Sequence, residues 1–157
     1  MTNSSEPPEQ HTGDPYLAEI ERSLRHGNYL REDERTLARI LEDDAEEVSR
    51  LGMDLEEIGD RMKKLYEEGQ RGLGDPVTVD GTFEVVVIEA RGILACPFRD
   101  HFPSPKVIVE AANLKTGRTL RFSVLGWHLI QEHGFFQGKG SPFRIEPRDL
   151  YDFFSGT

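Results

Sequence analysis

The sequence predicts an α+β protein in which acidic N-terminal helices are followed by a small antiparallel β-sheet domain with two short helices. Three observations support this. Apolar residues recur at helical spacing up to Gly69, and from Val77 onward they alternate with polar residues as in a strand. A glycine-rich segment, residues 70–76, separates the two patterns. The acidic charge lies before this boundary, because residues 1–75 contain ten Lys and Arg against twenty Asp and Glu, while residues 76–157 contain nine of each.

These changes of composition divide the chain into three predicted parts: a disordered tail (residues 1–13), an acidic helical segment of two to three helices (14–72) and an α+β domain (73–157). The tail is rich in Ser, Glu and Pro and has no periodic apolar residues, so it cannot bury enough apolar surface to fold. A chain of 157 residues is long enough for one ordinary domain, or for a small domain with a helical appendage.

The first two helices are predicted from start signals and apolar spacing. Asp14-Pro15 combines an N-cap residue with proline at the first helical position, and Gly27 ends the segment. A second helix is predicted from about Glu32 to Leu51, where a glycine follows as the C′ residue.

A third helix opens at Asp54. Glu57, three residues later, completes a capping-box pattern, and Gly69 closes the helix. The apolar stripes on these helices are narrow and the remaining faces are acidic. Such stripes are typical of surface or hairpin helices, yet they bury little area unless they meet a second hydrophobic surface. We therefore expect the N-terminal helices to dock to a protein partner or to a second copy of the chain, as a homodimer.

The sheet begins with the strongest short-range hairpin signal in the chain. Asp80-Gly81, flanked by alternating apolar residues, predicts a tight turn between strands over 77–79 and 82–90. A loop is predicted over 91–105, because proline lacks the N–H that a central strand needs.

A second strand pair is predicted over 106–112 and 119–124. A short helix follows over 125–133, where a glycine ends it, and Pro147 opens a last helix. The predicted core consists of apolar residues on the inner side of these elements: Phe83, Val85, Val87, Ile108, Leu120, Phe122, Leu129, Ile130, Phe135, Phe143, Leu150 and Phe153.

One group of residues points to specific chemistry. Cys96 and His101 form a Cys-x4-His pair, and His128 and His133 form a His-x4-His pair on the far side of the second predicted hairpin. Because antiparallel strands return to the same end of a hairpin, the loop and the helix should meet there. Thiolate and imidazole are ligands that zinc prefers. The sequence therefore predicts a zinc site formed by these four residues, with Asp100 as a reserve ligand.

The order of loop, hairpin and helix over residues 94–133 resembles the treble-clef class of zinc modules, from which it differs in having one loop cysteine rather than two. The resemblance implies a zinc ion held between the loop and the helix. Five residues along a helix turn through about 140°. We therefore expect the helix to tighten or to end at His133, so that its side chain can converge with that of His128.

Other interpretations of the same residues stay open. A lone cysteine is typical of a small buried hydrophobic position, His128 can be a hydrogen-bonded core residue, and His133 can complement the dipole of its helix. A thiol nucleophile with a histidine base would also use Cys96 and these histidines.

Charge, hydropathy and cysteine content bear on partners and compartment. The net charge of −10 in the first half would repel phosphate, so nucleic acid is not expected as a partner there. No apolar run approaches the roughly 18 residues of a transmembrane helix, so no membrane span is expected. The single cysteine excludes an intramolecular disulfide, which is typical of a reducing cytoplasm.

Three function hypotheses result. The first is a non-enzymatic interaction or regulatory module whose acidic helices dock to a partner and whose C-terminal domain is stapled by zinc. The second is a small metal- or thiol-dependent enzyme at the Cys/His group. The third is a module that binds single-stranded nucleic acid on its sheet, where Arg118 and Arg121 flank Phe122.

Overall fold

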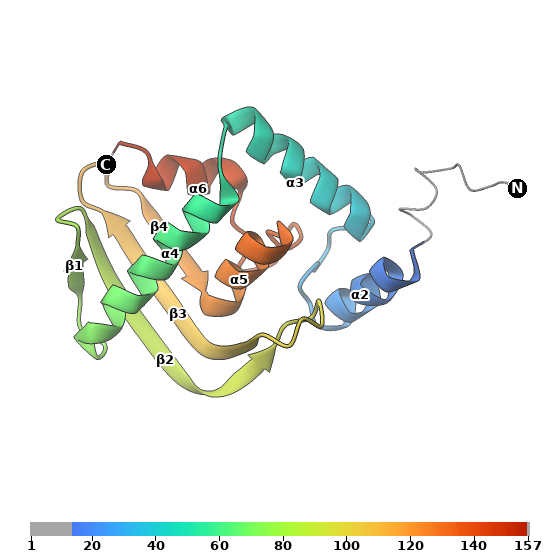
Figure 1. Ribbon diagram of the computed structural model, residues 1–157, viewed down its shortest axis with the longest axis horizontal. Helices are drawn as coiled ribbons and strands as arrows, with labels where there is room; N and C mark the ends of the chain where they lie inside the picture. The colour runs from blue at the N-terminus through green and yellow to red at the C-terminus, as the bar shows by residue number, and fades with distance from the viewer. Residues whose placement is uncertain (1–13, 157) are drawn as a thin grey trace, which may run out of the picture.

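The computed structural model describes residues 14–156 and confirms the α+β fold (Figure 1). The elements in chain order are α2 Pro15–His26, α3 Leu37–Leu51, α4 Leu55–Gly69, the 3-10 turn η1 Gln70–Gly72, β1 Val77–Val79, β2 Phe83–Ala95, β3 Pro103–Asn113, β4 Thr119–Ser123, α5 Val124–His133 and α6 Pro147–Phe154. The predicted disordered tail, residues 1–13, lies outside the described residues. Within the described range, none of the helices has the length and apolar character needed to cross a membrane.

The strands form one antiparallel sheet in the order β1-β2-β3-β4 (Figure 1). One face of the sheet packs against α4, α5 and α6, and the buried side chains of these elements form a single apolar cluster. On α4, Met62 and Leu65 belong to this cluster together with Val85 and Val87 of β2. The third predicted acidic helix therefore shares its core with the sheet.

A second apolar cluster joins the first two helices to α5. Its buried members come from α2, α3, α5 and the connecting segments: Ile20, Leu24, Leu30, Leu37, Ile40, Cys96, Phe98, Leu125, Leu129 and Phe135. The second hydrophobic surface that the narrow stripes require is thus supplied by the chain itself. Both core clusters meet α5, which places this helix at the centre of the molecule (Figure 1).

Side-chain caps determine where the N-terminal helices start. Asp14 accepts a hydrogen bond from the Tyr16 N–H, and Asp54 accepts hydrogen bonds from the N–H groups of Glu56 and Glu57, so both predicted N-caps are confirmed. Within residues 14–156 the Glu57 carboxylate does not return a bond to the Asp54 N–H, so the predicted capping box is only half formed. The predicted start of the second helix near Glu32 is wrong, because the helix begins at Leu37.

The residues before Leu37 form a turn of their own. The Asp33 carboxylate accepts hydrogen bonds from the backbone N–H and the guanidinium of Arg35. Thr36 then caps the helix by accepting a hydrogen bond from the Arg39 N–H. A short acidic side chain that bonds to nearby backbone favours a turn over a helix, which delays the start of α3.

The predicted first hairpin is confirmed. Asp80 and Gly81 both have positive φ, 54° and 64°, and form a tight turn that is closed by a hydrogen bond of 3.0 Å from the Thr82 N–H to the Val79 carbonyl. Thr82 stays outside the pairing, because Val79 pairs with Phe83, so β2 begins one residue later than predicted. β2 continues past the predicted end at residue 90 to Ala95, with an irregularity in its pairing with β3 between Ala90 and Ile93.

The exclusion of residues 103–105 from the sheet is wrong. Pro103 and Pro105 lie in β3 and pair with Ala95 and Ile93 of β2. β4 pairs only with residues 108–112 of β3, so β3 has a single neighbour at its prolines. Successive residues of a strand alternate in direction, and both prolines can therefore turn their missing N–H groups to the unpaired side.

Ten of the twelve predicted core residues are buried, and Ile108 and Phe143 are only half-buried. On β3 the inward positions are Val107, Val109 and Ala111, so Ile108 points to the opposite face of the sheet. A register shift of one residue turns every side chain of a strand to the opposite face of the sheet. Residues 107–109 are all apolar and β-branched, so the sequence does not show which of them point toward the core. Phe143 lies beneath the Arg121 guanidinium, 5.1 Å from its ring centroid.

Gly69 sets the close approach between α4 and the sheet. A methyl group at this position would lie 2.7 Å from Val85 Cγ1 and 2.7 Å from Val87 Cγ2. We expect Gly69→Ala to lower the free energy of unfolding by about 1–3 kcal/mol, because overpacking forces the helix away from the strand. Urea denaturation measures the loss. The exposed change Glu67→Ala is the control, and an equal effect of the two substitutions would contradict the close packing.

Candidate metal centre

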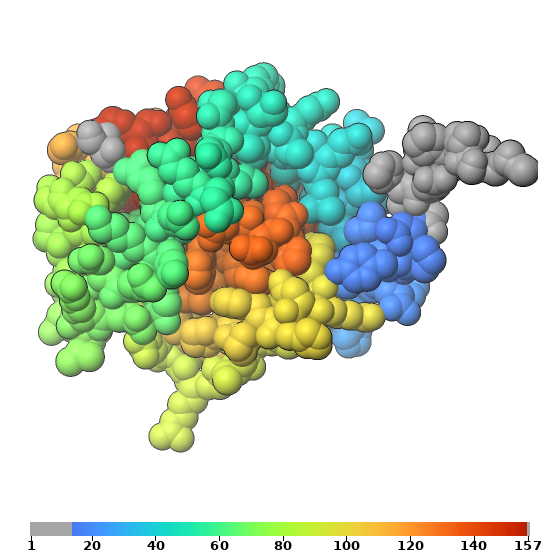
Figure 2. Space-filling model, viewed as in Figure 1, coloured from blue at the N-terminus to red at the C-terminus, as the bar shows by residue number. Residues whose placement is uncertain are grey.

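Two of the candidate ligands lie on the short loop that connects β2 to β3. The loop begins at Cys96, directly after the last pairing of the two strands, and ends at Phe102. It closes through a hydrogen bond from the Arg99 N–H to the Cys96 carbonyl (3.0 Å) and another from the Phe102 N–H to Asp100 Oδ1 (3.0 Å). Figure 2 shows this region of the chain (yellow) against α5 (orange) on the surface of the molecule.

The other two ligands lie on α5. Ser123 caps the helix by accepting a hydrogen bond from the Gly126 N–H, and the helix runs as far as His133. Gly134 follows with φ 61°, a left-handed conformation that glycine adopts without strain. The helix therefore ends at His133, as its convergence with His128 requires.

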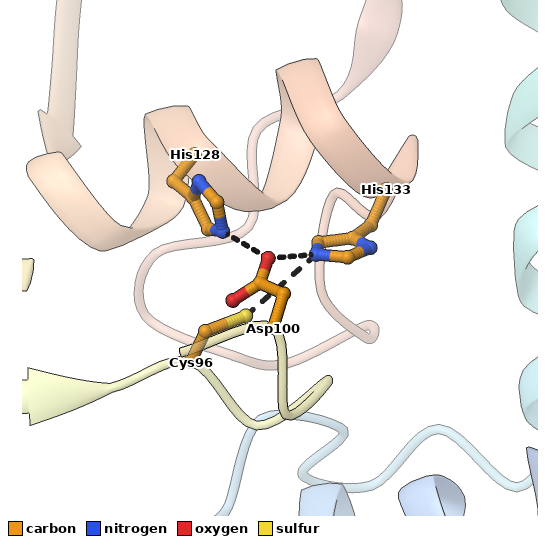
Figure 3. A group of neighbouring side chains, drawn as sticks. All are labelled: Cys96, Asp100, His128 and His133. Atoms are coloured by element: carbon orange, nitrogen blue, oxygen red, sulfur yellow. Dashed lines mark hydrogen bonds and ion pairs between the residues drawn. The ribbon is translucent and has the colours of Figure 1, made fainter. Parts of the chain in front are cut away.

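Cys96, Asp100, His128 and His133 meet at one point and form a group that could hold a metal ion. Their ligand atoms all lie within 4.8 Å of one another. Asp100 Oδ2 is 2.6 Å from His128 Nε2 and 2.7 Å from His133 Nε2, while Cys96 Sγ is 3.7 Å from His133 Nε2 (Figure 3). One carboxylate oxygen thus lies between both imidazoles, with the thiol beside them.

Two phenylalanines of the same loop hold the imidazole rings. Phe98 stacks on His133 at 4.3 Å between ring centroids, and Phe102 stacks on His128 at 3.8 Å, with interplanar angles of 10° and 6°. The two histidine rings are themselves nearly perpendicular, at 79°. Because each ring is stacked on an aromatic neighbour, the orientations of the ligand nitrogens are fixed before any ion binds.

The loop is also supported from α2. The Tyr16 hydroxyl donates a hydrogen bond of 2.8 Å to the Phe98 carbonyl, and Arg99 forms an ion pair with Glu19 at 2.8 Å. Arg99 itself has φ 63°, which is uncommon for a residue other than glycine. These contacts connect the N-terminal helices to the backbone that carries Cys96 and Asp100.

The group lies at the boundary between core and solvent. The Cys96 residue is 4% exposed and the His128 side chain 8%, whereas the Asp100 side chain is 29% exposed. Burial, together with the neighbouring Asp100 carboxylate, raises the pKa of the Cys96 thiol to about 11. Burial opposes ionisation of Asp100, but the Phe102 N–H and the two imidazoles outweigh it and hold the pKa of this carboxyl well below its usual range.

Three of the four ligands predicted from the sequence, Cys96, His128 and His133, are brought together. His101 is not, because its residue is exposed and lies in the left-handed region with φ 66°. Asp100, the reserve ligand, takes the fourth position. The stacking phenylalanines were not predicted, although Phe98 and Phe102 flank Asp100 at two-residue distance on either side.

Comparison of the chain with protein families, with curated proteins and with solved structures finds no match. The resemblance of residues 94–133 to treble-clef modules therefore stays a prediction. What the group binds has to be inferred from its own donor atoms and their surroundings.

Proposed function

We propose that Cys96, Asp100, His128 and His133 bind one zinc ion, and that the ion staples the β2–β3 loop to α5 in a non-enzymatic interaction or regulatory module. The observation that carries this proposal is the convergence of four donor atoms, one thiol, one carboxylate and two imidazoles, within 4.8 Å. A donor set of sulfur, nitrogen and oxygen suits zinc, whereas calcium and magnesium prefer oxygen alone.

The distances are close to those of a tetrahedral site. Zinc bonds of about 2.0–2.3 Å place neighbouring ligand atoms roughly 3.3–3.8 Å apart. Cys96 Sγ and His133 Nε2 are already 3.7 Å apart. The Asp100 oxygen, at 2.6 and 2.7 Å from the imidazoles, would move outward by under about 1 Å as an ion enters between them. Partial exposure of Asp100 leaves room for that movement.

A structural ion agrees better with this arrangement than a catalytic one. Four protein ligands complete a tetrahedron, while catalytic zinc keeps a position open for water or substrate. The ligands also come from two separate elements, the β2–β3 loop and α5, so an ion would cross-link them. Loading of the site would then control how firmly the loop and the attached helix α2 are held.

The thiol-enzyme alternative has less support. A nucleophilic cysteine has to be accessible to its substrate and ionised without the help of a metal. Cys96 is only 4% exposed, and burial together with the Asp100 carboxylate raises the pKa of its thiol to about 11 in the absence of an ion. The nucleic-acid alternative loses its stacking residue, because Phe122 is buried in the core at 1% exposure. Arg118 and Arg121 pair with Asp152 and Glu110 respectively.

We still propose a protein partner, but it would bind a different surface of the helices from the apolar stripes expected from the sequence. Since the apolar stripes of α2 and α3 are covered within the chain, a partner would meet the exposed acidic side of these helices, where Glu42 and Glu46 lie. Such a partner would carry basic groups. A homodimer through two acidic faces would have to overcome like-charge repulsion.

Cobalt(II) in place of zinc reports the ligands directly. We expect the full chain to bind one Co²⁺ with strong visible bands of a tetrahedral site and a near-ultraviolet band from thiolate coordination. Cys96→Ser should abolish the thiolate band, and His128→Ala should weaken binding at least about tenfold. His101→Ala is the matched control and should behave as the wild type. An unchanged near-ultraviolet spectrum in Cys96→Ser would refute thiolate coordination.

A further inference from the structure

A groove of about 490 Å³ lies apart from the metal group and shares none of its four residues. Its floor includes residues of β2 and β3 that point away from the core, Ile88 and Ile108 among them. Its walls come from the connection between α2 and α3, residues 27–31, and from the segment 137–143. The volume is within the range of about 300–1,000 Å³ that small-molecule sites occupy.

Apolar side chains form most of this groove. Five large apolar side chains line it: Ile88, Leu94, Ile108, Leu125 and Phe143. Ile88 is 47% exposed although it stands in the middle of a paired strand. Ile108, the residue that the sequence assigned to the core, also faces this hollow. An apolar surface of this kind, placed in a concavity rather than scattered, is typical of a ligand site.

A buried amide supplies a polar contact that the chain does not use. Gln137 lines the groove and is 5% exposed. Its Oε1 accepts a hydrogen bond from the Ser141 hydroxyl at 2.6 Å, whereas its Nε2 donates none to any residue between 14 and 156. A buried donor without an acceptor is unfavourable, because it has lost its hydrogen bonds to water. A ligand oxygen in the groove would supply the missing acceptor.

The charge of the lining is opposite to that of the whole protein. Arg31 and Lys106 line the groove, and no Asp or Glu does. Within the part of the chain that the structure describes, neither cation forms an ion pair, and Arg31 Nε donates one long hydrogen bond, of 3.4 Å, to the Gly140 carbonyl. In a chain of net charge −10, a groove lined by two cations without ion pairs and by no carboxylate attracts an anion.

From these features we infer that the groove binds a small amphipathic anion, a molecule with an apolar body and one carboxylate. The apolar body would cover Ile88, Ile108 and Phe143. The carboxylate would accept hydrogen bonds from the cations or from the Gln137 amide. Such a ligand would cover the apolar surface, accept a hydrogen bond from the Gln137 amide and neutralise positive charge. A neutral apolar molecule could only cover the apolar surface.

Decanoate is the probe, and decan-1-ol is its uncharged counterpart of equal chain length. Isothermal titration calorimetry on the full chain should give one decanoate site, with affinity at least about tenfold above that for decan-1-ol. Arg31→Ala/Lys106→Ala should weaken decanoate binding at least about tenfold and leave decan-1-ol unchanged. The matched control Lys63→Ala/Lys115→Ala removes two exposed lysines outside the groove and should change neither affinity.

Two further results decide the inference. Ile88→Asp places a charge in the apolar part of the groove, so decanoate and decan-1-ol should both lose affinity. Because Ile88 is half-exposed, the variant should keep the circular dichroism spectrum of the wild type. Absence of a saturable decanoate site in the wild type would overturn the inference. Equal affinity for decanoate and decan-1-ol in the wild type would overturn it as well, because the groove would then be an apolar surface without anion selectivity.

Discussion

Removing zinc with a chelator is expected to lower the melting temperature of the zinc-loaded chain by roughly 8–16 °C. An ion that binds only the folded chain stabilises it by about 4 kcal/mol when its free concentration is a thousandfold above Kd. For a chain of this size, each kcal/mol shifts the melting temperature by about 2–4 °C. The apo protein should still fold cooperatively, because both apolar clusters extend well beyond the four ligands.

Differential scanning calorimetry with and without chelator measures this shift, and ligand variants identify its origin. Cys96→Ser should melt at the same temperature in both conditions. His101→Ala, one residue from Asp100 but outside the group, should keep the full shift. A wild-type melting temperature that does not respond to chelator would contradict the staple, whatever the variants do.

Arg144→Ala is expected to lower the free energy of unfolding by about 3–5 kcal/mol. The Arg144 guanidinium donates to both carboxylate oxygens of Asp44, at 3.0 and 2.9 Å, and to the Gln137 carbonyl at 2.7 Å. Both side chains of the ion pair are only 7% exposed. Removing the arginine leaves a carboxylate of α3 buried without a counter-charge, which costs more than the ion pair itself contributes.

The surface pair Arg148–Asp152 provides the matched control for this prediction. Arg148 is 65% exposed on its side chain, so Arg148→Ala should cost at most about 1 kcal/mol. The double variant Asp44→Leu/Arg144→Met, which replaces the pair by apolar side chains of similar size, should recover part of the loss. Equal unfolding free energies for Arg144→Ala and Arg148→Ala would show that α3 does not pack against the 137–146 segment in this way.

The sequence predicted the fold well where the signal is local. Asp14 and Asp54 cap their helices and mark where those helices begin, and Asp80-Gly81 adopts the two positive φ values that its hairpin needs. Local signals were insufficient to predict which face of the sheet a side chain points to, because this depends on how the strand pairs with its neighbours. Ile108 faces outward because β3 is held in register by β2 and β4, and no property of the residue itself reveals this.

Residue type and topology were sufficient to predict three of the four residues of the candidate site, but not the fourth. Antiparallel pairing brings the loop to the end of α5, so Cys96 meets His128 and His133 as expected. The choice between Asp100 and His101 depends on how the loop backbone turns. The backbone of His101 lies in the left-handed region, and two long-range ring stacks complete the arrangement. The left-handed backbone at His101 has no signature in the sequence, and the only sequence signal for the ring stacks is the placement of Phe98 and Phe102 on either side of Asp100.

Zinc content tests the central claim most directly. The full chain is purified without chelator, equilibrated with a slight excess of Zn²⁺, separated from free metal by gel filtration and analysed by elemental mass spectrometry. We predict about one zinc ion per chain in the wild type and in His101→Ala, and none retained in Cys96→Ser/His133→Ala. A wild-type chain that leaves the column without zinc, or a Cys96→Ser/His133→Ala variant that retains it, would contradict a metal centre at this group.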